Sequence, residues 1–326
     1  MTSPTARRRW LPRLLGPLLL GIILLRLDLG ELAAAFEGVW LLPVAGACLA
    51  VLPTVPLRSW RWRILVAASG TRLEAVEALN AYAFSIVVGA ATPGRLGELI
   101  KIGYLRSKGV STSAAVLSVG LDRLLDVAFL AIVGAGALAA HFGGRSAAVV
   151  ASAMLGTAVL GVAALSYALS AHGRRAAGSL VSRLLPLALS RRIQPAISSL
   201  GSQAEGLSKS TLGAVGLLTA LTWIATYLAV YLCAVALGLD VPFLDVCGVT
   251  AVSSLVTFLP ISILGLGTRD VSLIALLAPF GVPATGAVAL SALYLGITLW
   301  VVLACSYSLV TPAASAWRGR AEAIHT

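Results

Sequence analysis

The stretch that decides the fold of this chain reads Ala91-Thr-Pro-Gly-Arg-Leu-Gly-Glu-Leu-Ile-Lys101. It lies between two apolar segments, yet it contains a helix-breaking proline, two glycines and three charged residues within about three helical turns. A second stretch with similar residues, Leu264-Gly-Leu-Gly-Thr-Arg-Asp270, lies late in the chain. We predict that the two stretches are broken helices that together form the functional site.

The composition places the chain in the membrane. Of its 326 residues, 59% are hydrophobic and 11% are charged, and the mean hydropathy is +0.95. Repeated apolar stretches of about 20 residues predict transmembrane helices. The net charge of +11 comes from short basic segments that flank apolar ones. This placement is typical of contact with anionic lipid headgroups, and it argues against a nucleic-acid partner.

The cysteines and histidines predict no metal site and no cofactor. The four cysteines lie in apolar stretches without paired spacing, which indicates small core residues and neither a disulfide framework nor a zinc site. The three histidines lie in predicted loops or in the C-terminal tail. These residues are Cys48, Cys233, Cys247, Cys305, His141, His172 and His325.

The apolar segments predict an all-α polytopic membrane protein with a single membrane domain. The first apolar run could be a signal peptide, but Arg26 and Asp28 interrupt the approach to a cleavage site, and this favours an uncleaved helix. The only sizeable hydrophilic segment, 171–209, is too short for a catalytic domain. We expect helices at about 11–30, 39–63, 74–92, 113–140, 147–170, 210–238, 243–261 and 284–311, with a short apolar piece at 264–281.

An internal repeat appears when the chain is aligned with itself at an offset of 172 residues. Glu98 then meets Asp270, and the helical segments of the two halves coincide. We predict a first repeat at about 11–140 and a second at about 147–312, interrupted by a cytoplasmic basic loop at 171–209.

The basic residues predict the topology. If residues 75–108 enter and leave on one side, 18 of the 24 Lys and Arg residues share the inside. A single crossing would instead put the arginine-rich 174–209 segment outside, which the positive-inside rule disfavours. We therefore predict an inverted-repeat bundle of about eight transmembrane segments with two broken or re-entrant helical hairpins. Both termini would be cytoplasmic.

The first broken helix has the residues of an anion site. Thr92 can cap a helix that has Pro93 in its first turn, and free N–H groups at such a start attract phosphate. The charged residues follow at three-residue steps and would share one face, where an arginine can give forked hydrogen bonds and a glutamate can balance it. The predicted binding residues of this stretch are Thr92, Pro93, Gly94, Arg95, Gly97, Glu98 and Lys101.

The second broken helix repeats this pattern. Its glycines allow tight backbone, its threonine can cap a helix, and a cation and an anion again stand together. The predicted binding residues are Gly265, Gly267, Thr268, Arg269 and Asp270. A plainer interpretation is that Arg95–Glu98 and Arg269–Asp270 are ion pairs that only stabilise hairpin packing, because charges at this depth need partners.

A third charged group, Asp122, Arg123 and Asp126, has no charged counterpart in the second repeat. These acids could couple protons to transport, or they could simply neutralise Arg95; we favour neutralisation. Trp223 begins an aromatic stripe with four-residue spacing, and packing is the more frequent role of such a stripe.

At these residues the sequence resembles the lysylphosphatidylglycerol synthase transmembrane, or flippase-like, family. The resemblance rests on Thr-Pro-Gly-Arg-Leu-Gly-Glu at 92–98, Asp-Arg-x-x-Asp at 122–126 and Gly-Leu-Gly-Thr-Arg-Asp at 265–270. It implies translocation of a phospholipid or a polyprenyl-linked lipid across the bacterial inner membrane. Asp270 stands where the family usually has glutamate. We expect no lysyl transfer, because these residues contain no aminoacyltransferase domain.

The sequence thus predicts a non-enzymatic flippase whose substrate is a membrane lipid with an anionic headgroup. Two alternatives stay open: a lipid-modifying transferase or phosphatase that uses Glu98, Asp122 and Asp126, and an accessory subunit that docks a separate lipid synthase through 171–209. A proton-coupled solute carrier is a further possibility, since fold alone does not specify the substrate.

Overall fold

The computed structural model describes residues 20–25, 27, 29–141, 208–258 and 262–311, together with positions 152, 155, 156, 175 and 179. All regular secondary structure within these ranges is helical, which confirms the predicted all-α membrane fold. Most of the helix predicted at 11–30, the helix predicted at 147–170 and the basic loop at 171–209 lie outside the described residues.

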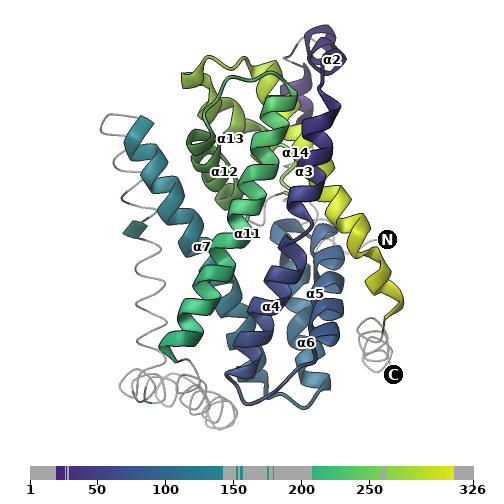
Figure 1. Cartoon of the computed structure of the whole chain (residues 1–326), viewed down its shortest axis with the longest axis vertical. Coiled ribbons are helices and arrows are strands. Elements are labelled where there is room, and N and C mark those ends of the chain that lie inside the picture. Colours follow the sequence, from purple (N-terminus) through teal and green to yellow (C-terminus); the bar gives the residue numbers. More distant parts are fainter. Residues whose placement is uncertain are drawn as a thin grey trace, which may run out of the picture.

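Long helices form the frame of the molecule (Figure 1). Within the described residues, three stretches of 27 residues are long and apolar enough to cross a membrane: Leu41–Ala67, Ser210–Ala236 and Ala284–Val310. They correspond to α3 (Leu41–Val51) with α4 (Thr54–Ala67), to α11 (Lys209–Ala236), and to α14 (Ala284–Cys305) with η3 (Ser306–Val310). The short helix α2 (Leu29–Glu37) precedes α3. The helix α7 (Thr112–His141) has 30 residues, and it carries the charged group 122–126.

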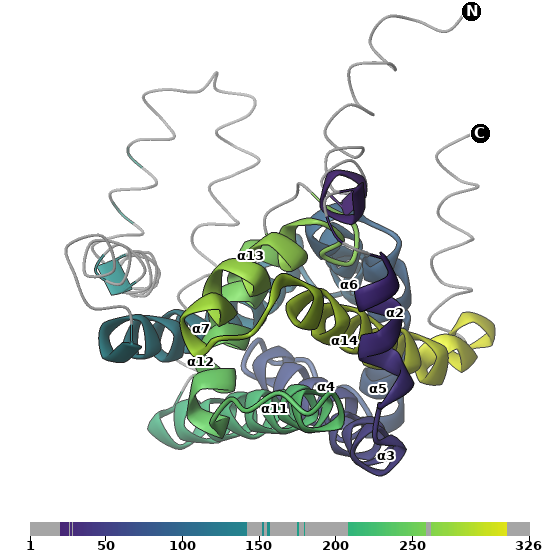
Figure 2. The same ribbon diagram turned by 90° about the horizontal axis from the view of Figure 1, so that it is seen from above.

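Two helical hairpins fill the frame from opposite ends. Hairpin 1 consists of α5 (Ala75–Ala90), η1 (Pro93–Leu99) and α6 (Ile100–Ser107). Hairpin 2 consists of α12 (Phe243–Thr257) and α13 (Thr268–Leu277), followed by η2 (Ala278–Phe280). In Figure 1 hairpin 1 occupies the lower half of the molecule and hairpin 2 the upper half. Viewed from above in Figure 2, α12 and α13 accordingly lie nearer the viewer than α5 and α6.

The length of the hairpin helices explains why each hairpin turns back. The helix α5 has 16 residues and α12 has 15, so each is only about 24 Å long, less than the roughly 30 Å of a bilayer core. The tips of the two hairpins touch, because the N–H of Gly94 donates a hydrogen bond to the carbonyl of Ser262 at 3.2 Å. The first predicted stretch therefore contacts hairpin 2 at Ser262, two residues before the second predicted stretch.

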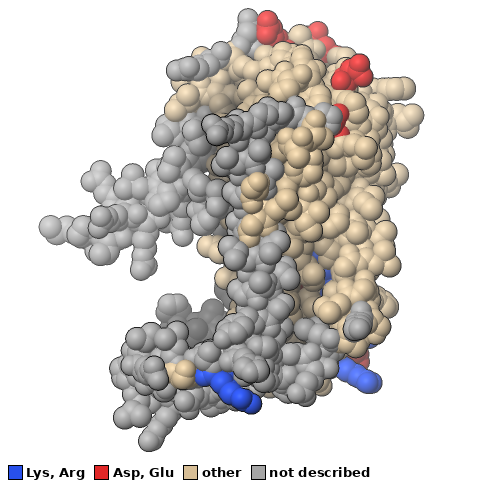
Figure 3. All heavy atoms as spheres, turned by 90° about the vertical axis from the view of Figure 1, so that its left-hand side faces the viewer, with Lys and Arg blue, Asp and Glu red and all other residues tan. Residues whose placement is uncertain are grey.

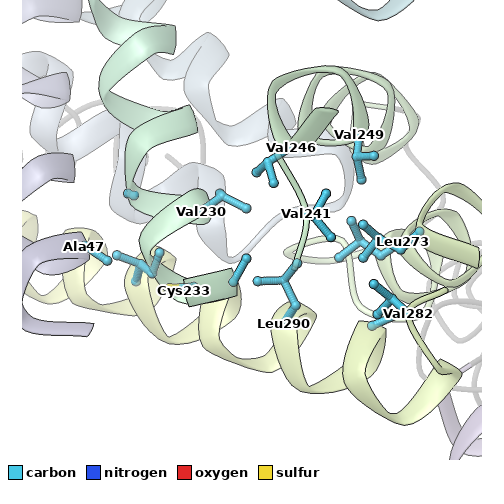
Figure 4. Close-up of a cluster of buried hydrophobic side chains, with 14 of the residues drawn as sticks. Ala47, Val230, Cys233, Val241, Val246, Val249, Leu273, Val282 and Leu290 are labelled. Atoms are coloured by element: carbon cyan, nitrogen blue, oxygen red, sulfur yellow. The ribbon is translucent and has the colours of Figure 1, made fainter. Parts of the chain in front are cut away.

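Each hairpin has its own apolar core. Around hairpin 1, Trp62 and Val66 of α4 pack with Tyr82, Leu105 and Ala115. Around hairpin 2, the core joins α3, α11, α12, α13 and α14 (Figure 4). Its labelled members are Ala47, Val230, Cys233, Val241, Val246, Val249, Leu273, Val282 and Leu290. Two cores of this kind let each hairpin fold against the frame as a separate packing unit.

Exposed charge is segregated along the long axis. Figure 3 shows acidic side chains gathered at the upper end and basic ones at the lower end. Exposed acids at the end of hairpin 2 include Glu31, Glu37 and Asp240, and exposed cations at the end of hairpin 1 include Arg106 and Lys108. The long axis therefore separates two chemically distinct surfaces.

Close packing of α12 on α7 generates a first prediction. A Cβ added at Gly248 would fall inside the van der Waals radius of the Ala137 methyl group, whereas one added at Gly216 of α11 would meet nothing within 4 Å. Gly248→Ala should therefore destabilise the protein by about 1–3 kcal/mol through overpacking. Gly216→Ala should be neutral or slightly stabilising.

Thermal unfolding in detergent measures both variants. The double variant Gly248→Ala/Ala137→Gly should recover much of the lost stability, since it restores the space between the helices. Equal melting temperatures for the two single variants would show that α12 and α7 do not pack this closely.

Candidate functional site

The tip of hairpin 1 is a turn whose backbone hydrogen bonds are already used. The Thr92 hydroxyl accepts a hydrogen bond from the N–H of Gly97 at 2.6 Å and donates to the carbonyl of Gly89 at 3.0 Å. Pro93 is the first residue of η1, as predicted. A Cβ at Gly97 would lie 2.5 Å from the carbonyl oxygen of Val88, so only glycine allows this contact.

The prediction that free backbone N–H groups of this tip bind an anion is therefore wrong, because these groups already donate hydrogen bonds within the protein. The N–H of Gly94 binds Ser262, that of Arg95 binds the carbonyl of Thr92, and that of Gly97 binds the Thr92 hydroxyl. The reason is local: Gly94 and Arg95 are both left-handed, with φ of 57° and 56°, which turns the backbone away from a regular helix start. Any anion at this tip must be held by side chains.

The conformation of Arg95 is costly. A left-handed conformation of a non-glycine residue costs about 1–2 kcal/mol, and such strain concentrates at functional sites. No carboxylate among the described residues lies within ion-pairing distance of its guanidinium. Arg95 is thus a strained cation without an ion-pair partner in that part of the chain.

The tip of hairpin 2 is built differently. The helix α13 is preceded by Gly267, which has φ of 78°, and the Asp270 carboxylate accepts a hydrogen bond from the Gly267 N–H at 2.7 Å. The Thr268 hydroxyl does not cap the helix as predicted; it lies 2.7 Å from the Ser262 hydroxyl. Gly265 approaches Thr257 so closely that a Cβ would meet the Thr257 methyl group at 2.6 Å.

The predicted Arg269–Asp270 ion pair does not form, because Asp270 caps the helix instead. The Arg269 guanidinium donates to the hydroxyl and the carbonyl of Ser291, at 2.9 and 3.0 Å. It also lies 5.0 Å from the ring centroid of Tyr294, a cation–π contact. Arg269 therefore keeps its full charge near the tip and is held there by neutral partners.

The predicted Arg95–Glu98 pair does not form either. The Glu98 carboxylate pairs with Arg123 of α7 and lies 3.9 Å from Lys101. Lys101 is fully buried, and its ammonium contacts Asp122 at 2.9 Å. The three-residue steps keep Glu98 and Lys101 on one face, but the left-handed turn removes Arg95 from that series.

A buried ion network joins hairpin 1 to the frame. Arg61 of α4 is 0% exposed and forms ion pairs of 2.7 Å with both Asp122 and Asp126 of α7. Its guanidinium also donates to the Thr219 hydroxyl at 2.9 Å. The Tyr82 hydroxyl donates to Asp122 at 3.0 Å, so α4, α5, α7 and α11 all meet at these two carboxylates.

This network corrects two sequence expectations. A cluster of arginines and tryptophans such as the one at 58–63 is typical of the headgroup layer, but Arg61 and Trp62 are both fully buried and only Trp60 is well exposed. The acids at 122–126 were expected to neutralise Arg95, but they neutralise Arg61, Arg58 and Lys101. The sequence did contain a signal for this pairing in the spacing of its charged residues. Two arginines three residues apart can face two aspartates one turn apart.

The main cavity lies between the two hairpins and the frame and holds about 850 Å³, including its open mouth. Its charged lining consists of Arg58, Arg95 and Glu98. Arg58 lies 3.8 Å from Asp126 and 5.2 Å from the Trp223 ring centroid, and the Trp223 indole donates to Asp126 at 3.0 Å. Much of the remaining wall is apolar, and it includes Val51, Val55, Ile86, Ala90, Ile297, Val301 and Val302.

A smaller side chamber of about 390 Å³ lies at the contact between the hairpin tips. Arg95 and Arg269 both line it, together with Gly94, Gly265 and Tyr294. Several hydroxyl side chains complete the wall: Ser253, Ser254, Thr257, Ser262 and Thr298. Among the described residues the chamber lining contains no carboxylate. It shares six lining residues with the main cavity: Arg95, Ser254, Thr257, Leu264, Tyr294 and Thr298.

The predicted site residues therefore separate into two groups. Arg95, Glu98 and Arg269 line the cavities, whereas Lys101, Asp122 and Asp126 belong to the buried network beside them. Residues that sequence reasoning missed as site residues are Arg58, Trp223, Ser254 and Tyr294. No group of metal-ligating side chains occurs among the described residues.

These features define the class of protein: an all-α membrane protein with opposed helical hairpins and a polar cavity between them. A family model, described as the lysylphosphatidylglycerol synthase TM region, matches residues 13–306. The chain belongs to this family of membrane proteins of lipid metabolism and translocation. Neither the curated proteins nor the solved structures contain a match to it.

The buried network generates a second prediction. Asp126→Asn removes the charge that faces Arg61 and Arg58 while keeping the shape of the side chain. Because it removes one of the two carboxylates that compensate the buried Arg61, and the one that pairs with Arg58, we expect a loss of about 3–5 kcal/mol in stability. The control Lys108→Gln breaks the partly exposed pair with Glu77, where about 0–1 kcal/mol is at stake.

Thermal unfolding of both variants in detergent, measured side by side, checks this expectation. A melting temperature of Asp126→Asn close to that of Lys108→Gln would contradict the structural role of the network.

Proposed function

We propose that the chain translocates a lipid with an anionic headgroup across the bacterial inner membrane, without covalent change to the lipid. The observation that carries the proposal is Arg95, a strained cation without an ion-pair partner among the described residues, at the point where two opposed hairpins touch. A charge at membrane depth is expensive unless water or a ligand compensates it. A transported anion is such a ligand.

The lining of the main cavity suits a lipid. Arg58, Arg95 and Glu98 supply the charged lining among the described residues, and much of the remaining wall is apolar. A headgroup can therefore lie against the arginines while the acyl chains follow the apolar wall toward the bilayer. This combination of a few convergent polar groups with an apolar lining is typical of ligand sites.

The arrangement of the hairpins suits transport. Opposed broken helices that meet near the centre of a membrane are the architecture of alternating-access transporters. We propose that hairpin 1 is re-entrant from the cytoplasmic side, because exposed basic residues such as Arg106 and Lys108 lie at its end of the molecule. Hairpin 2 would then enter from the opposite side.

The contacts of the acids support a transporter over an enzyme. Oxygen atoms of Asp122 and Asp126 already bind Arg61, Lys101 and Trp223, and Glu98 pairs with Arg123. A general acid or base needs a proton that can move toward substrate, which these partners hinder. The same contacts favour a structural role for the two aspartates over proton coupling.

Flipping by proteoliposomes that contain fluorescent phosphatidylglycerol tests the proposal. Arg95→Ala should reduce the flip rate at least about tenfold, since hydrogen bonds to a charged group contribute about 1.5–3 kcal/mol. The matched control is Arg106→Ala, on the exposed end of hairpin 1, which should keep the wild-type rate. An active wild type with an unaffected Arg95→Ala variant would refute the assignment of Arg95.

Lipid mass spectrometry separates transport from chemistry. We expect lipids recovered from active wild-type proteoliposomes to keep their masses, because the proposed reaction forms and breaks no bond. New lipid species that depend on Glu98, for example ones that Glu98→Gln abolishes, would favour the lipid-modifying enzyme instead.

A further inference from the structure

We infer that the side chamber is a phosphate-binding site, called the seat below. It is formed by Arg95 of hairpin 1 and by Arg269 and Ser254 of hairpin 2. The inference rests on the proposed function and deepens it, because it names the chemistry of the headgroup and separates its site from the site of the tails. The seat takes a phosphate ester, whether on a lipid or on a smaller molecule.

Charge is the first reason. Arg95 and Arg269 both line the chamber and repel each other across it. Arg58, which lines the main cavity, adds a third cation that repels Arg95. Among the described residues no carboxylate lines the chamber, and the acids that attract its arginines, Asp126 for Arg95 and Asp270 for Arg269, lie outside this lining. Because like charges in a weakly polar surrounding are unfavourable, an anion that binds between them relieves the repulsion as well as forming hydrogen bonds.

The unused hydrogen-bond donor of Ser254 is the second and independent reason. The other serine and threonine hydroxyls of the chamber contact protein partners: Thr257 donates to the Ser254 carbonyl, Thr298 donates to the Tyr294 carbonyl, and Ser262 and Ser253 bind Thr268 and Ser272. The Ser254 hydroxyl is 5% exposed, lines both cavities and has no hydrogen-bond partner in the described part of the chain. A buried polar group of this kind needs a ligand or water.

Geometry favours phosphate over carboxylate. Arg269 uses its Nε and one terminal nitrogen on Ser291, and its other terminal nitrogen has no hydrogen bond to the described part of the chain and could bind a ligand. Arg95 and Ser254 approach from the opposite hairpin and from α12. Donors that converge from three elements match the several oxygens of a tetrahedral phosphate better than the two oxygens of a planar carboxylate.

The seat also explains how the two hairpins can respond to one ligand. Its cations come from both hairpins, whose tips are joined directly by the hydrogen bond from Gly94 to Ser262. A phosphate that bridges Arg95 and Arg269 strengthens this contact, and its departure leaves two like charges facing each other. Occupancy of the seat therefore favours closed tips, and an empty seat favours separated tips.

Calorimetric titration of the full chain in dodecyl maltoside, a phosphate-free detergent, tests the seat. The probes are dioctanoyl phosphatidylglycerol, inorganic phosphate and dioctanoylglycerol hemisuccinate, a carboxylate lipid with the same tails. The variants are Ser254→Ala and Ser308→Ala. Ser308 is a matched control, because its hydroxyl is also buried without a hydrogen-bond partner among the described residues but lines neither cavity.

We expect wild type to bind the phosphate lipid about tenfold more tightly than the hemisuccinate, and Ser254→Ala to lose about tenfold in affinity for the phosphate lipid alone. Ser308→Ala should bind as wild type does. Both variants should fold, since each removes a hydroxyl that has no partner, and unchanged melting temperatures verify this. Equal affinities of wild type and Ser254→Ala, or equal affinities for phosphate and carboxylate lipids, would overturn the seat.

The two sources of phosphate are distinguished by the same titrations. Tighter binding of phosphatidylglycerol than of inorganic phosphate supports a seat for a lipid headgroup, with the tails in the main cavity. Equal affinities support a seat for free phosphate or for a soluble ester. If the protein flips lipid but Ser254→Ala binds the phosphate lipid as tightly as wild type does, the seat is refuted and the proposed translocation stands. If Ser254→Ala weakens binding of the phosphate lipid but the wild-type protein flips no lipid, the proposed translocation is refuted and the seat stands.

Discussion

The burial of Arg61 is the constraint on which much of this structure depends. A guanidinium with no exposed surface inside a membrane protein is tolerated only when carboxylates compensate it, and Asp122 and Asp126 do so at 2.7 Å each. Because these carboxylates also bind Tyr82, Lys101 and Trp223, the positions of α4, α5, α6, α7 and α11 are mutually linked. The network thereby fixes where hairpin 1 ends and where its tip lies.

The same compensation leaves the tip itself positively charged. Once Asp122, Asp126 and Glu98 have partners in the frame, no acid remains at ion-pairing distance from Arg95 among the described residues. The strained backbone at Gly94 and Arg95 then brings this cation to the contact with hairpin 2, near Arg269. Positive and negative charges are thus balanced in the buried network beside the site. At the contact between the hairpin tips, the positive charges of the arginines remain.

The two hairpins are held by different forces. Hairpin 1 is fastened by ion pairs through Glu98 and Lys101. Hairpin 2 is held by small-residue packing, such as Gly248 on Ala137, by hydrogen bonds from Arg269 to Ser291 of α14, and by an apolar core. Buried ion pairs are costly to separate, whereas helices packed through small residues can slide with little penalty. This difference is consistent with a fixed first hairpin and a more adaptable second one.

The sequence by itself determined the class of protein, most of the described helices and the two stretches that meet at the site. Hydropathy and helix-breaking residues report these features directly, because each depends on a short segment and its contact with lipid. The pairing of charges was decided only by the tertiary structure. Arg61 looked like a surface residue, and the predicted partners of Arg95 and Arg269 proved wrong, because an ion pair depends on which helices pack together. Local spacing places charges on a face, but only packing of distant helices determines what that face meets.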